Sequence, residues 1–426
     1  MALARFLIFF LGAALAPLLL SSCADASEVG VNYGMVANDL LDPESAVQLI
    51  LDNGITTVRI YDTNATVLNA LANTGIKVLV MMPNDNIAGA ARSRSYALGW
   101  VRSNVAAYLP DTDIRGLAVG NEVFEQAKNL TSLLLPAMVN VQAALARLGL
   151  DDAVKVTTPV AFDAIMDPSF PPSGARFRDD IAQSVMKPML QFLQRTGSYL
   201  TINPYPFLAI AREPQNIELD FALGNYEPGH RDNNTGFVYN SLLDAMRDAT
   251  FFAIENLTES QMSESILPTT KLTSLINPCS PSQFFIKLDS TWMTEVGDLI
   301  FRQTMASGSN GAQTSTVWTE TGWASGGTVR LGKKPAATSS DDGTSECPPA
   351  TVANAKAYNN YVINRVLSGD TGTPRYPDID MVVYIFALFN ENKKGVDSGD
   401  AERYYGLFYP NGTKVYDFDF QGTDAK

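Results

Sequence analysis

Eight short apolar runs recur along this chain, and segments with helical spacing separate them. Several of the runs are continuous stretches of Val, Ile and Leu, which is typical of strands that are covered on both faces. Eight strand–helix units predict an α/β protein with a parallel (β/α)8 TIM barrel. A doubly wound open sheet shares the alternation, but no Gly-x-Gly-x-x-Gly motif follows the first run. The expected strands are Val29–Asn32, Thr57–Tyr61, Lys77–Met82, Gly116–Gly120, Lys155–Pro159, Tyr199–Asn203, Ser315–Thr319 and Met381–Phe386.

Three of the intervening segments have clear helical signals. Asp42 is suited to cap a helix whose first turn holds Pro43. Amphipathic spacing predicts two further helices, over Ser95–Leu109 and Leu130–Leu148.

Two long stretches, Thr258–Gln313 and Leu331–Pro349, interrupt this alternation. We interpret them as insertions that flank the seventh strand within one domain, residues 27–426. Each contains one of the two cysteines that remain after removal of an N-terminal leader, Cys279 and Cys347. An even pair in an oxidising compartment predicts one disulfide, and two free buried thiols are the alternative.

Residues 1–26 have the pattern of a secretory signal peptide. Arg5 precedes the apolar run Phe6–Leu20, and Ala24–Ala26 provides a small-x-small cleavage site. Leu20–Cys23 also resembles a bacterial lipobox, which would give a lipid-anchored form. We expect no later membrane span and no anchor, so the mature protein should be secreted, extracellular or in the cell wall.

The charge and the single histidine narrow the function classes. A formal net charge of −14 over 426 residues argues against nucleic acid as a partner. Because His230 is the only histidine, the sequence argues against multi-histidine zinc sites and histidine-based triads. We expect a monomer without cofactor or metal. Five Asn-x-Ser/Thr sequons are candidate glycosylation sites if the host is eukaryotic: Asn64, Asn129, Asn233, Asn256 and Asn411.

Four acids follow strand ends, where the active sites of such barrels lie: Asp62, Asp85, Glu122 and Glu320. Asp62 and Asp85 lie beside asparagines, and we interpret both as hydrogen-bonding partners of their own loops.

The two glutamates have more distinctive neighbours. Asn121 precedes Glu122 and offers an amide to a sugar hydroxyl. Trp318 and Trp323 bracket Glu320, and aromatic faces suit the apolar C–H surfaces of sugars; ordinary core packing is the alternative for Trp318. Two facing carboxylates form the standard machinery for cleaving a glycosidic bond.

Seven motifs, in order along nearly the whole mature chain, resemble those of the plant-type glucan endo-1,3-β-glucosidases of glycoside hydrolase family 17. They are Val29–Gly34, Val58–Asp62, Val119–Glu122, Asn203–Pro206, Thr319–Trp323, Ala387–Lys394 and Gly406–Gly412.

The resemblance implies a (β/α)8 barrel and a retaining mechanism, with Glu122 as acid/base and Glu320 as nucleophile. The pKa of Glu122 should be raised, and a nearby Lys394 should hold the pKa of Glu320 down, although Lys394 is also placed to pair with Glu391. The residues implied in substrate binding or cleft support are Tyr33, Asn121, Tyr205, Trp323, Glu391 and Lys394.

Two residues depart from the family's motifs. Ala324 stands where proline is usual, and Pro204 replaces an aliphatic residue in Asn203–Pro206. The expected substrate is a β-1,3-glucan, cleaved internally. Three alternatives remain open: a mixed-linkage 1,3-1,4-β-glucanase, a transglycosylase at the same site, and a weakly active β-glucan-binding wall protein.

Overall fold

The structure is a computed structural model, and it describes residues 27–166, 170–264, 315–330, 344–345 and 349–422. The expected signal peptide, Cys279, Cys347 and most of both expected insertions lie outside these residues.

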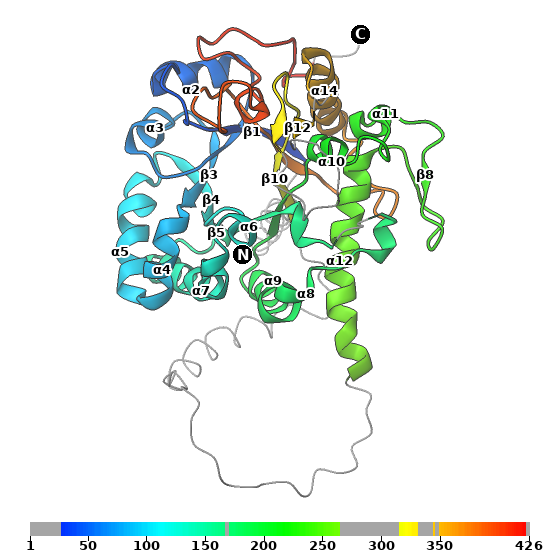
Figure 1. Ribbon diagram of the computed structural model, residues 1–426. Coiled ribbons are helices and arrows are strands. Elements are labelled where there is room, and N and C mark those ends of the chain that lie inside the picture. Colours follow the sequence, from blue (N-terminus) through cyan, green and yellow to red (C-terminus); the bar gives the residue numbers. More distant parts are fainter. Residues whose placement is uncertain (1–26, 167–169, 265–314, 331–343, 346–348, 423–426) are drawn as a thin grey trace, which may run out of the picture.

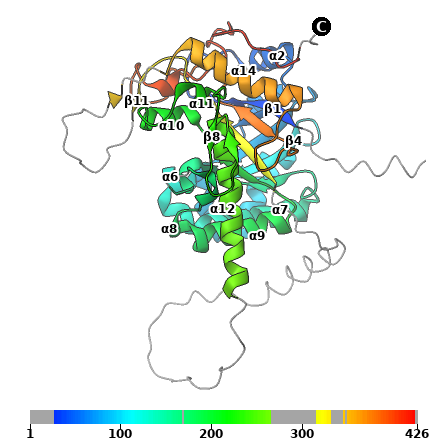
Figure 2. The same ribbon diagram turned by 90° about the vertical axis from the view of Figure 1, so that its right-hand side faces the viewer.

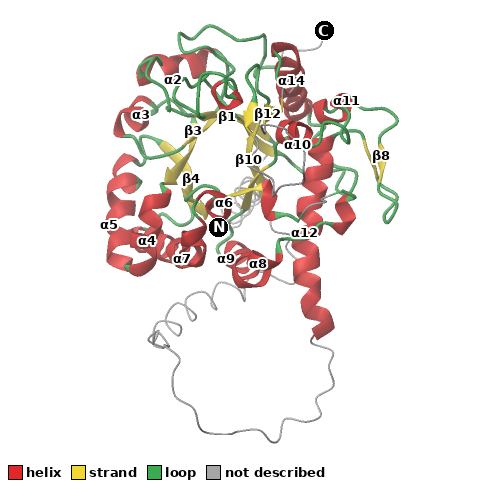
Figure 3. Ribbon diagram, in the orientation of Figure 1, coloured by secondary structure: helices red, strands yellow, loops and turns green. Residues whose placement is uncertain are grey.

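Parallel strands form a ring, and the helices lie outside it (Figure 3). Their order is β5-β4-β3-β2-β1-β13-β10-β7-β6. This arrangement confirms the predicted (β/α)8 barrel, and all eight expected strands are present. Their bounds are β1 Glu28–Tyr33, β2 Thr57–Ile60, β3 Lys77–Met82, β4 Asp113–Val119, β5 Lys155–Thr157, β6 Pro159–Ala161, β7 Leu200–Asn203, β10 Thr316–Thr321 and β13 Val382–Ile385.

The fifth predicted strand is divided into β5 and β6, separated by Thr158. β5 pairs with β4, whereas β6 pairs with β7. The fifth strand therefore closes the ring, with β5 bonded to the strand on one side and β6 to the strand on the other.

Helices cover the outer face of the ring in the order expected from the alternation. Asp42 caps α2 by accepting from the backbone N–H of Ser45, as predicted. The helix expected from Ser95 starts at Arg94 and ends at Asn104. The helices between these strands, apart from those of the β7–β10 connection, are α2 Pro43–Asp52, α3 Ala65–Ala70, α4 Asn84–Arg92, α5 Arg94–Asn104, α6 Val123–Gln126, α7 Thr131–Leu148, α8 Asp179–Ile181, α9 Lys187–Arg195 and α14 Val352–Ser368.

The segment Lys128–Leu148, which contains α7, is long and apolar enough to cross a membrane by length and composition, contrary to our expectation for the mature chain. In the structure α7 packs against α4 and α5 of the same barrel. Its apolar face is thus the core-facing stripe of a barrel helix.

The connection from β7 to β10 is the longest. It contains α10 Pro206–Arg212, α11 Leu219–Leu223, the hairpin of β8 His230–Arg231 and β9 Val238–Tyr239, and α12 Leu242–Glu264. The hairpin projects beside α11 (Figure 1), and α12 runs along the outside of the barrel, facing the viewer in Figure 2. A short antiparallel pair, β11 Val329–Arg330 and β12 Thr344–Ser345, follows β10.

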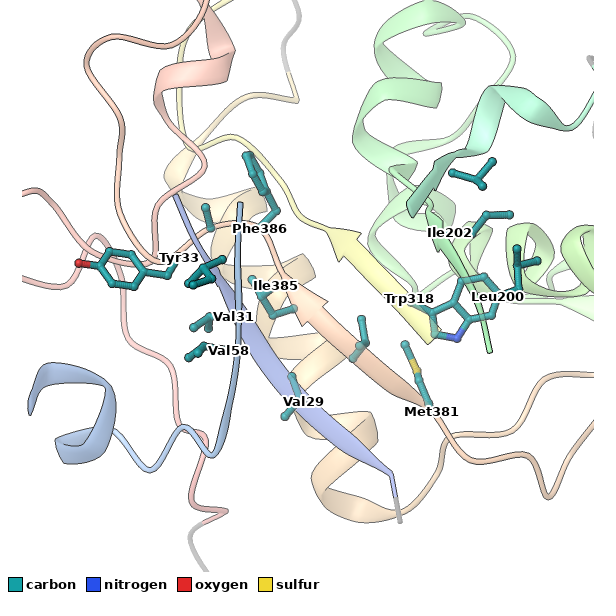
Figure 4. Packing of buried hydrophobic residues seen from close by; sticks show 14 of the residues in the cluster. Val29, Val31, Tyr33, Val58, Leu200, Ile202, Trp318, Met381, Ile385 and Phe386 are labelled. Atoms are coloured by element: carbon teal, nitrogen blue, oxygen red, sulfur yellow. The ribbon is translucent and has the colours of Figure 1, made fainter. Parts of the chain in front are cut away.

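Alternation along the strands assigns side chains to two layers. On β1, Val29, Val31 and Tyr33 belong to the large core between strands and helices, part of which is drawn in Figure 4. Trp318 lies in this core, 1% exposed, so core packing is the correct interpretation of that residue. The intervening positions face the barrel interior, where a small second cluster contains Leu79, Met81, Ala118 and Tyr384.

Candidate active site

A cleft of about 900 Å³ opens at the carboxyl ends of the strands. Its lining includes Glu122 and Glu320 together with Asn121, Tyr205 and Lys394. The structure therefore brings five of the eight predicted catalytic and substrate-binding residues to one cleft.

Glu320 enters the cleft because β10 is irregular. Between the pairs Trp318–Val383 and Thr321–Ile385, β10 has one more residue than β13. This bulge turns Thr319 and Glu320 both toward the interior, where strict alternation would turn only one of them.

Both oxygens of the Glu320 carboxylate accept short hydrogen bonds. Arg59 donates Nη1–H to Oε1 over 2.6 Å, and the Tyr205 hydroxyl donates to Oε2 over 2.8 Å. Burial raises the pKa of Tyr205 well above its usual range, and the charge of Glu320 raises it further, so the phenol remains a donor. A buried carboxylate held by a cation and a phenol is a fixed negative charge at the cleft floor.

Arg59 extends from the middle of β2 and is fully buried. Besides Glu320, it donates to the Thr319 carbonyl at 3.1 Å and to Asn121 Oδ1 at 2.6 Å. Its guanidinium lies 4.6 Å from the centroid of the Tyr61 ring. Sequence reasoning did not assign Arg59 a role, although a charged residue inside the apolar motif Val58–Asp62 was a detectable signal.

Glu122 sits just after β4 in a left-handed backbone conformation, φ 46° and ψ 42°, which is uncommon for a residue with a side chain. Its Oε1 accepts from Asn203 at 2.8 Å and its Oε2 from Gln126 at 2.7 Å. Burial raises the pKa of Glu122 to about 7, and the charge of Glu320 also raises it, while the two amide hydrogen bonds oppose the shift. Near neutral pH this carboxyl group can both give and take a proton.

Two chains of hydrogen bonds connect the glutamates. Thr319, the neighbour of Glu320, donates to Asn203 Oδ1 at 2.8 Å, and Asn203 in turn donates to Glu122. Arg59 joins Glu320 to Asn121, the neighbour of Glu122. The relative positions of the two carboxyl groups are thus set by buried side chains on β2, β7 and β10.

Asn121 uses its amide oxygen to accept from Arg59, so its NH2 group faces away from the guanidinium. Its backbone N–H and carbonyl both bond to the side chain of Asn84, at 2.8 and 3.1 Å. A donor fixed beside Glu122 fits the predicted contact with a sugar hydroxyl. Pro204 does not displace this region, because both Asn203 and Tyr205 reach a glutamate.

The cation paired with Glu320 is Arg59, whose Nη1 lies 2.6 Å from Oε1. Among the described residues Lys394 forms no ion pair with Glu320, and its predicted effect on the pKa of Glu320 stays a prediction. The ammonium group of Lys394 lies 3.6 Å from Glu391 Oε2 and 4.0 Å from Glu402 Oε2. It borders the cleft, as does Glu402, whose pKa is raised by burial.

Glu391 is buried, 2% exposed, and its Oε1 accepts the backbone N–H of Val36 at 2.7 Å. It is not among the residues that line the cleft. Its hydrogen bond fixes the loop after β1, which fits the predicted supporting role, and the structure gives it no place in the cleft lining.

Two predicted sugar contacts are wrong. Tyr33 is 1% exposed and packs edge-on against Phe389, because strand alternation directs it to the helix side with Val31. Trp323 is fully buried, and its indole N–H donates to the Pro349 carbonyl over 2.6 Å. Neither lines the cleft.

The other predicted positions have local roles. Asp62 accepts from the backbone N–H of Asn64, as expected for a loop partner, and Asp85 lies in the first turn of α4. Ala324 is fully buried.

Asn256 is a poor glycosylation candidate, because it lies within α12 and its Nδ2 donates to the Ala175 carbonyl at 2.8 Å. The other four sequon asparagines are exposed: Asn64, Asn129, Asn233 and Asn411. Within the described parts of the chain, no group of three or more His, Cys, Asp or Glu side chains is arranged to hold a metal ion.

Comparison with known sequences gives one family. The family model described as glycosyl hydrolases family 17 matches residues 29–269 and 298–420. Glucan endo-1,3-beta-glucosidases 13 and 12 of Arabidopsis thaliana are 35% and 33% identical to this chain over 95% and 94% of its length. The chain spans 66% and 61% of the length of these two relatives.

Two solved structures of plant β-glucanases resemble this chain over nearly their whole length. A β-1,3-glucanase and allergen of Cryptomeria japonica pollen superposes with a TM-score of 0.70 at 34% identity, covering 92% of this chain and 99% of that one. A structure from a pair of plant β-glucan endohydrolases with distinct substrate specificities gives a TM-score of 0.69 at 33% identity, covering 92% of this chain and 100% of the other.

Proposed function

Because the chain belongs to glycosyl hydrolases family 17, we propose that it is a retaining endo-1,3-β-glucanase with Glu320 as nucleophile and Glu122 as acid/base. The observation that carries the proposal is the pair of glutamates with opposite surroundings in one cleft. Glu320 is held by a cation and a phenol, whereas the pKa of Glu122 is about 7. Relatives named glucan endo-1,3-beta-glucosidases support β-1,3-glucan as the substrate.

In the first step Glu320 attacks the anomeric carbon and forms a covalent bond to it. The glycosidic C–O bond breaks, and the proton of Glu122 goes to the leaving oxygen. Arg59 and Tyr205 aim the attacking carboxylate, while Asn203 and Gln126 orient the acid. Such fixed donors reduce the reorganisation that the reaction needs.

In the second step the ionised Glu122 takes a proton from a water molecule, and the water oxygen attacks the anomeric carbon. The bond to Glu320 breaks, and both carboxyl groups return to their starting protonation states. Two inversions at one carbon retain its configuration. A sugar hydroxyl in place of water would give transglycosylation.

The size of the cleft supports internal attack. At about 900 Å³ it lies near the upper end of the ~300–1,000 Å³ that encloses a drug-sized ligand, which is more than one sugar ring requires. Its lining continues from the strand ends to α10, α11 and the β8–β9 hairpin. We therefore expect several glucosyl units to bind at once.

The test is incubation of the purified mature protein with laminarin, mixed-linkage β-glucan and cellulose, with sizing of the products. The proposal predicts rapid loss of viscosity and short oligosaccharides from laminarin, before much glucose appears. Preferential cleavage of mixed-linkage glucan would identify the other linkage class, and products longer than the substrate would identify a transglycosylase. Binding of laminarin without cleavage would contradict the enzyme and favour a wall-binding protein.

We also propose that the protein is secreted, without a membrane anchor, and acts as a monomer in the extracellular space or the cell wall. The leader-like residues 1–26 and the four exposed sequons support export. N-terminal sequencing of protein from the culture medium should find Ser27 as the first residue, and sedimentation should give the mass of one chain.

A further inference from the structure

One wall of the cleft, away from the strand ends, is aromatic. Phe170, Phe221 and His230 line it, and we call these three residues the aromatic wall. The Phe170 ring lies edge-on to Phe221 and to His230, with centroids 6.5 and 6.0 Å apart. Phe170 is nevertheless 38% exposed, so part of its ring is free of these neighbours and open to a ligand in the cleft.

The chain that follows Phe170 is fixed to the β8–β9 hairpin. Ser173 donates its backbone N–H and its hydroxyl to the two carboxylate oxygens of Asp232, each over 3.0 Å. Asp232 is fully buried and also accepts from the backbone N–H of Asn234. The exposed ring thus sits on a supported element, which limits the entropy that a bound ligand would remove.

His230 is held from two sides. It stacks on Tyr226, with centroids 4.8 Å apart and planes at 12°, and its Nε2 lies 2.9 Å from Glu218 Oε2. The Phe221 ring lies edge-on to the imidazole, with ring centroids 4.5 Å apart. The imidazole therefore extends the aromatic wall as a rigid ring.

We propose that the aromatic wall, with Phe170 as its exposed face, binds a glucosyl unit of the β-1,3-glucan chain away from the bond that is cleaved. This inference rests on the proposed function and names one further specificity-determining position for it. A pyranose presents axial C–H groups to an aromatic face and hydroxyls around its edge. Arg212 and Asn216, which also line the cleft and lead into α11, can bond such hydroxyls.

Phe170 should therefore affect the enzyme's preference for long over short substrates. A glucan long enough to reach the wall gains the stacking contact, whereas a short oligosaccharide that fills only the region around Glu122 and Glu320 does not. Because the wall shares the cleft with both glutamates, the same chain can occupy both regions.

The kinetic test is Phe170→Ala assayed on laminarin and on laminaritriose. We expect kcat/KM on laminarin to fall about 10-fold, the loss of roughly one aromatic contact, with the value on laminaritriose nearly unchanged. Phe170→Trp should keep the preference for the long substrate. Tyr409→Ala is the matched control, because Tyr409 is an aromatic residue of similar exposure, 43%, that does not line the cleft.

A binding test uses the single histidine as a reporter. His230 is the only histidine of the chain, so its ring signals in an NMR spectrum of histidine-labelled protein need no assignment. In the Glu320→Gln protein, laminarihexaose should shift these signals, and adding Phe170→Ala should weaken the apparent affinity. This measurement also serves if the kinetic variant folds poorly, because the first titration leaves Phe170 intact.

The two proposals fail differently. If the wild-type protein cleaves laminarin, but Phe170→Ala matches it on both substrates and laminarihexaose leaves the His230 signals unmoved, the aromatic wall is not a sugar site. If the wild-type protein neither binds nor cleaves laminarin, the proposed function is wrong and this inference falls with it.

Discussion

Glu122 and Glu320 carry the same functional group, and their different neighbours fit the different tasks that we propose for them. Arg59 and Tyr205 occupy both oxygens of Glu320, so a fixed negative charge faces the cleft. The Glu122 carboxyl group accepts from two neutral amides, burial raises its pKa to about 7, and the charge of nearby Glu320 raises it as well. At the residue scale this difference is the basis of the proposed mechanism.

Replacement of Glu320 by Gln should remove the nucleophile and keep the shape of the side chain. We expect kcat on laminarin to fall at least about 1,000-fold, with glucan binding by calorimetry near normal. Glu320→Gly with azide should release a glycosyl azide of inverted configuration from a substrate with a good leaving group. Near wild-type turnover by Glu320→Gln would show that another group attacks.

The pH dependence should report Glu122. Because the acid acts in its protonated form, kcat/KM on laminarin should be retained below pH 7 and lost as the pH rises through about 7. Glu122→Gln should abolish this alkaline limb and slow laminarin cleavage far more than glycosylation by an activated aryl glycoside, whose leaving group needs no proton. An unchanged alkaline limb in Glu122→Gln would assign the titration to a different group.

The place of the two glutamates and Asn121 in the cleft was predictable from sequence, because each follows an apolar strand in a recognisable motif; their roles stay predictions. The cation that pairs with Glu320 was not predictable. Lys394 belongs to a recognised motif but pairs with Glu391, whereas Arg59 reaches Glu320 from inside the barrel. Tyr33 and Trp323 were misassigned for one reason: adjacency in sequence to a site residue does not say on which face of a strand a ring lies.

At the scale of elements, irregular strand ends position the two glutamates. β10 contains a bulge at Thr319 and Glu320, and two left-handed residues lie just after β4, Gly120 with φ 74° and Glu122 with φ 46°. Just beyond Glu320, Gly322 passes so close to the Phe386 carbonyl that a Cβ atom there would lie 2.1 Å from the oxygen.

Gly322→Ala should therefore move the end of β10. We expect it to lower the free energy of unfolding by about 1–3 kcal/mol and to reduce kcat by more than the fraction of unfolded protein explains. The matched control is Gly326→Ala in the same loop, where the nearest atom to a Cβ, in the Tyr404 ring, is 3.8 Å away. Denaturant unfolding and laminarin assays would compare them, and equal behaviour of the two variants would contradict the steric argument.

The strand positions followed from the apolar pattern to within a few residues, because burial on both faces leaves a strong signal. The bulge in β10 and the division of the fifth strand at Thr158 have no signal in the sequence, because each depends on pairing with a partner strand. The apolar pattern of a segment shows that it forms a strand, whereas the register depends on two paired strands together.

At the scale of the whole molecule, the barrel aligns eight strand ends, and the long β7–β10 connection adds α11, the hairpin and α12 on one side (Figure 1). The sequence predicted the barrel but not this aromatic side of the cleft, because Phe170 and His230 are far apart in the chain and lie in segments without periodic pattern. The arrangement supports a cleft that holds a chain, with the reaction at its strand-end floor.

The most direct test of this account follows the configuration of the product. Proton NMR of laminarin during the first minutes of hydrolysis distinguishes β from α reducing ends before mutarotation mixes them. A double displacement through Glu320, with Glu122 as acid and then base, predicts that β signals appear first and α signals later. New reducing ends that form first as α anomers would contradict the nucleophilic role of Glu320 and the retaining mechanism with it.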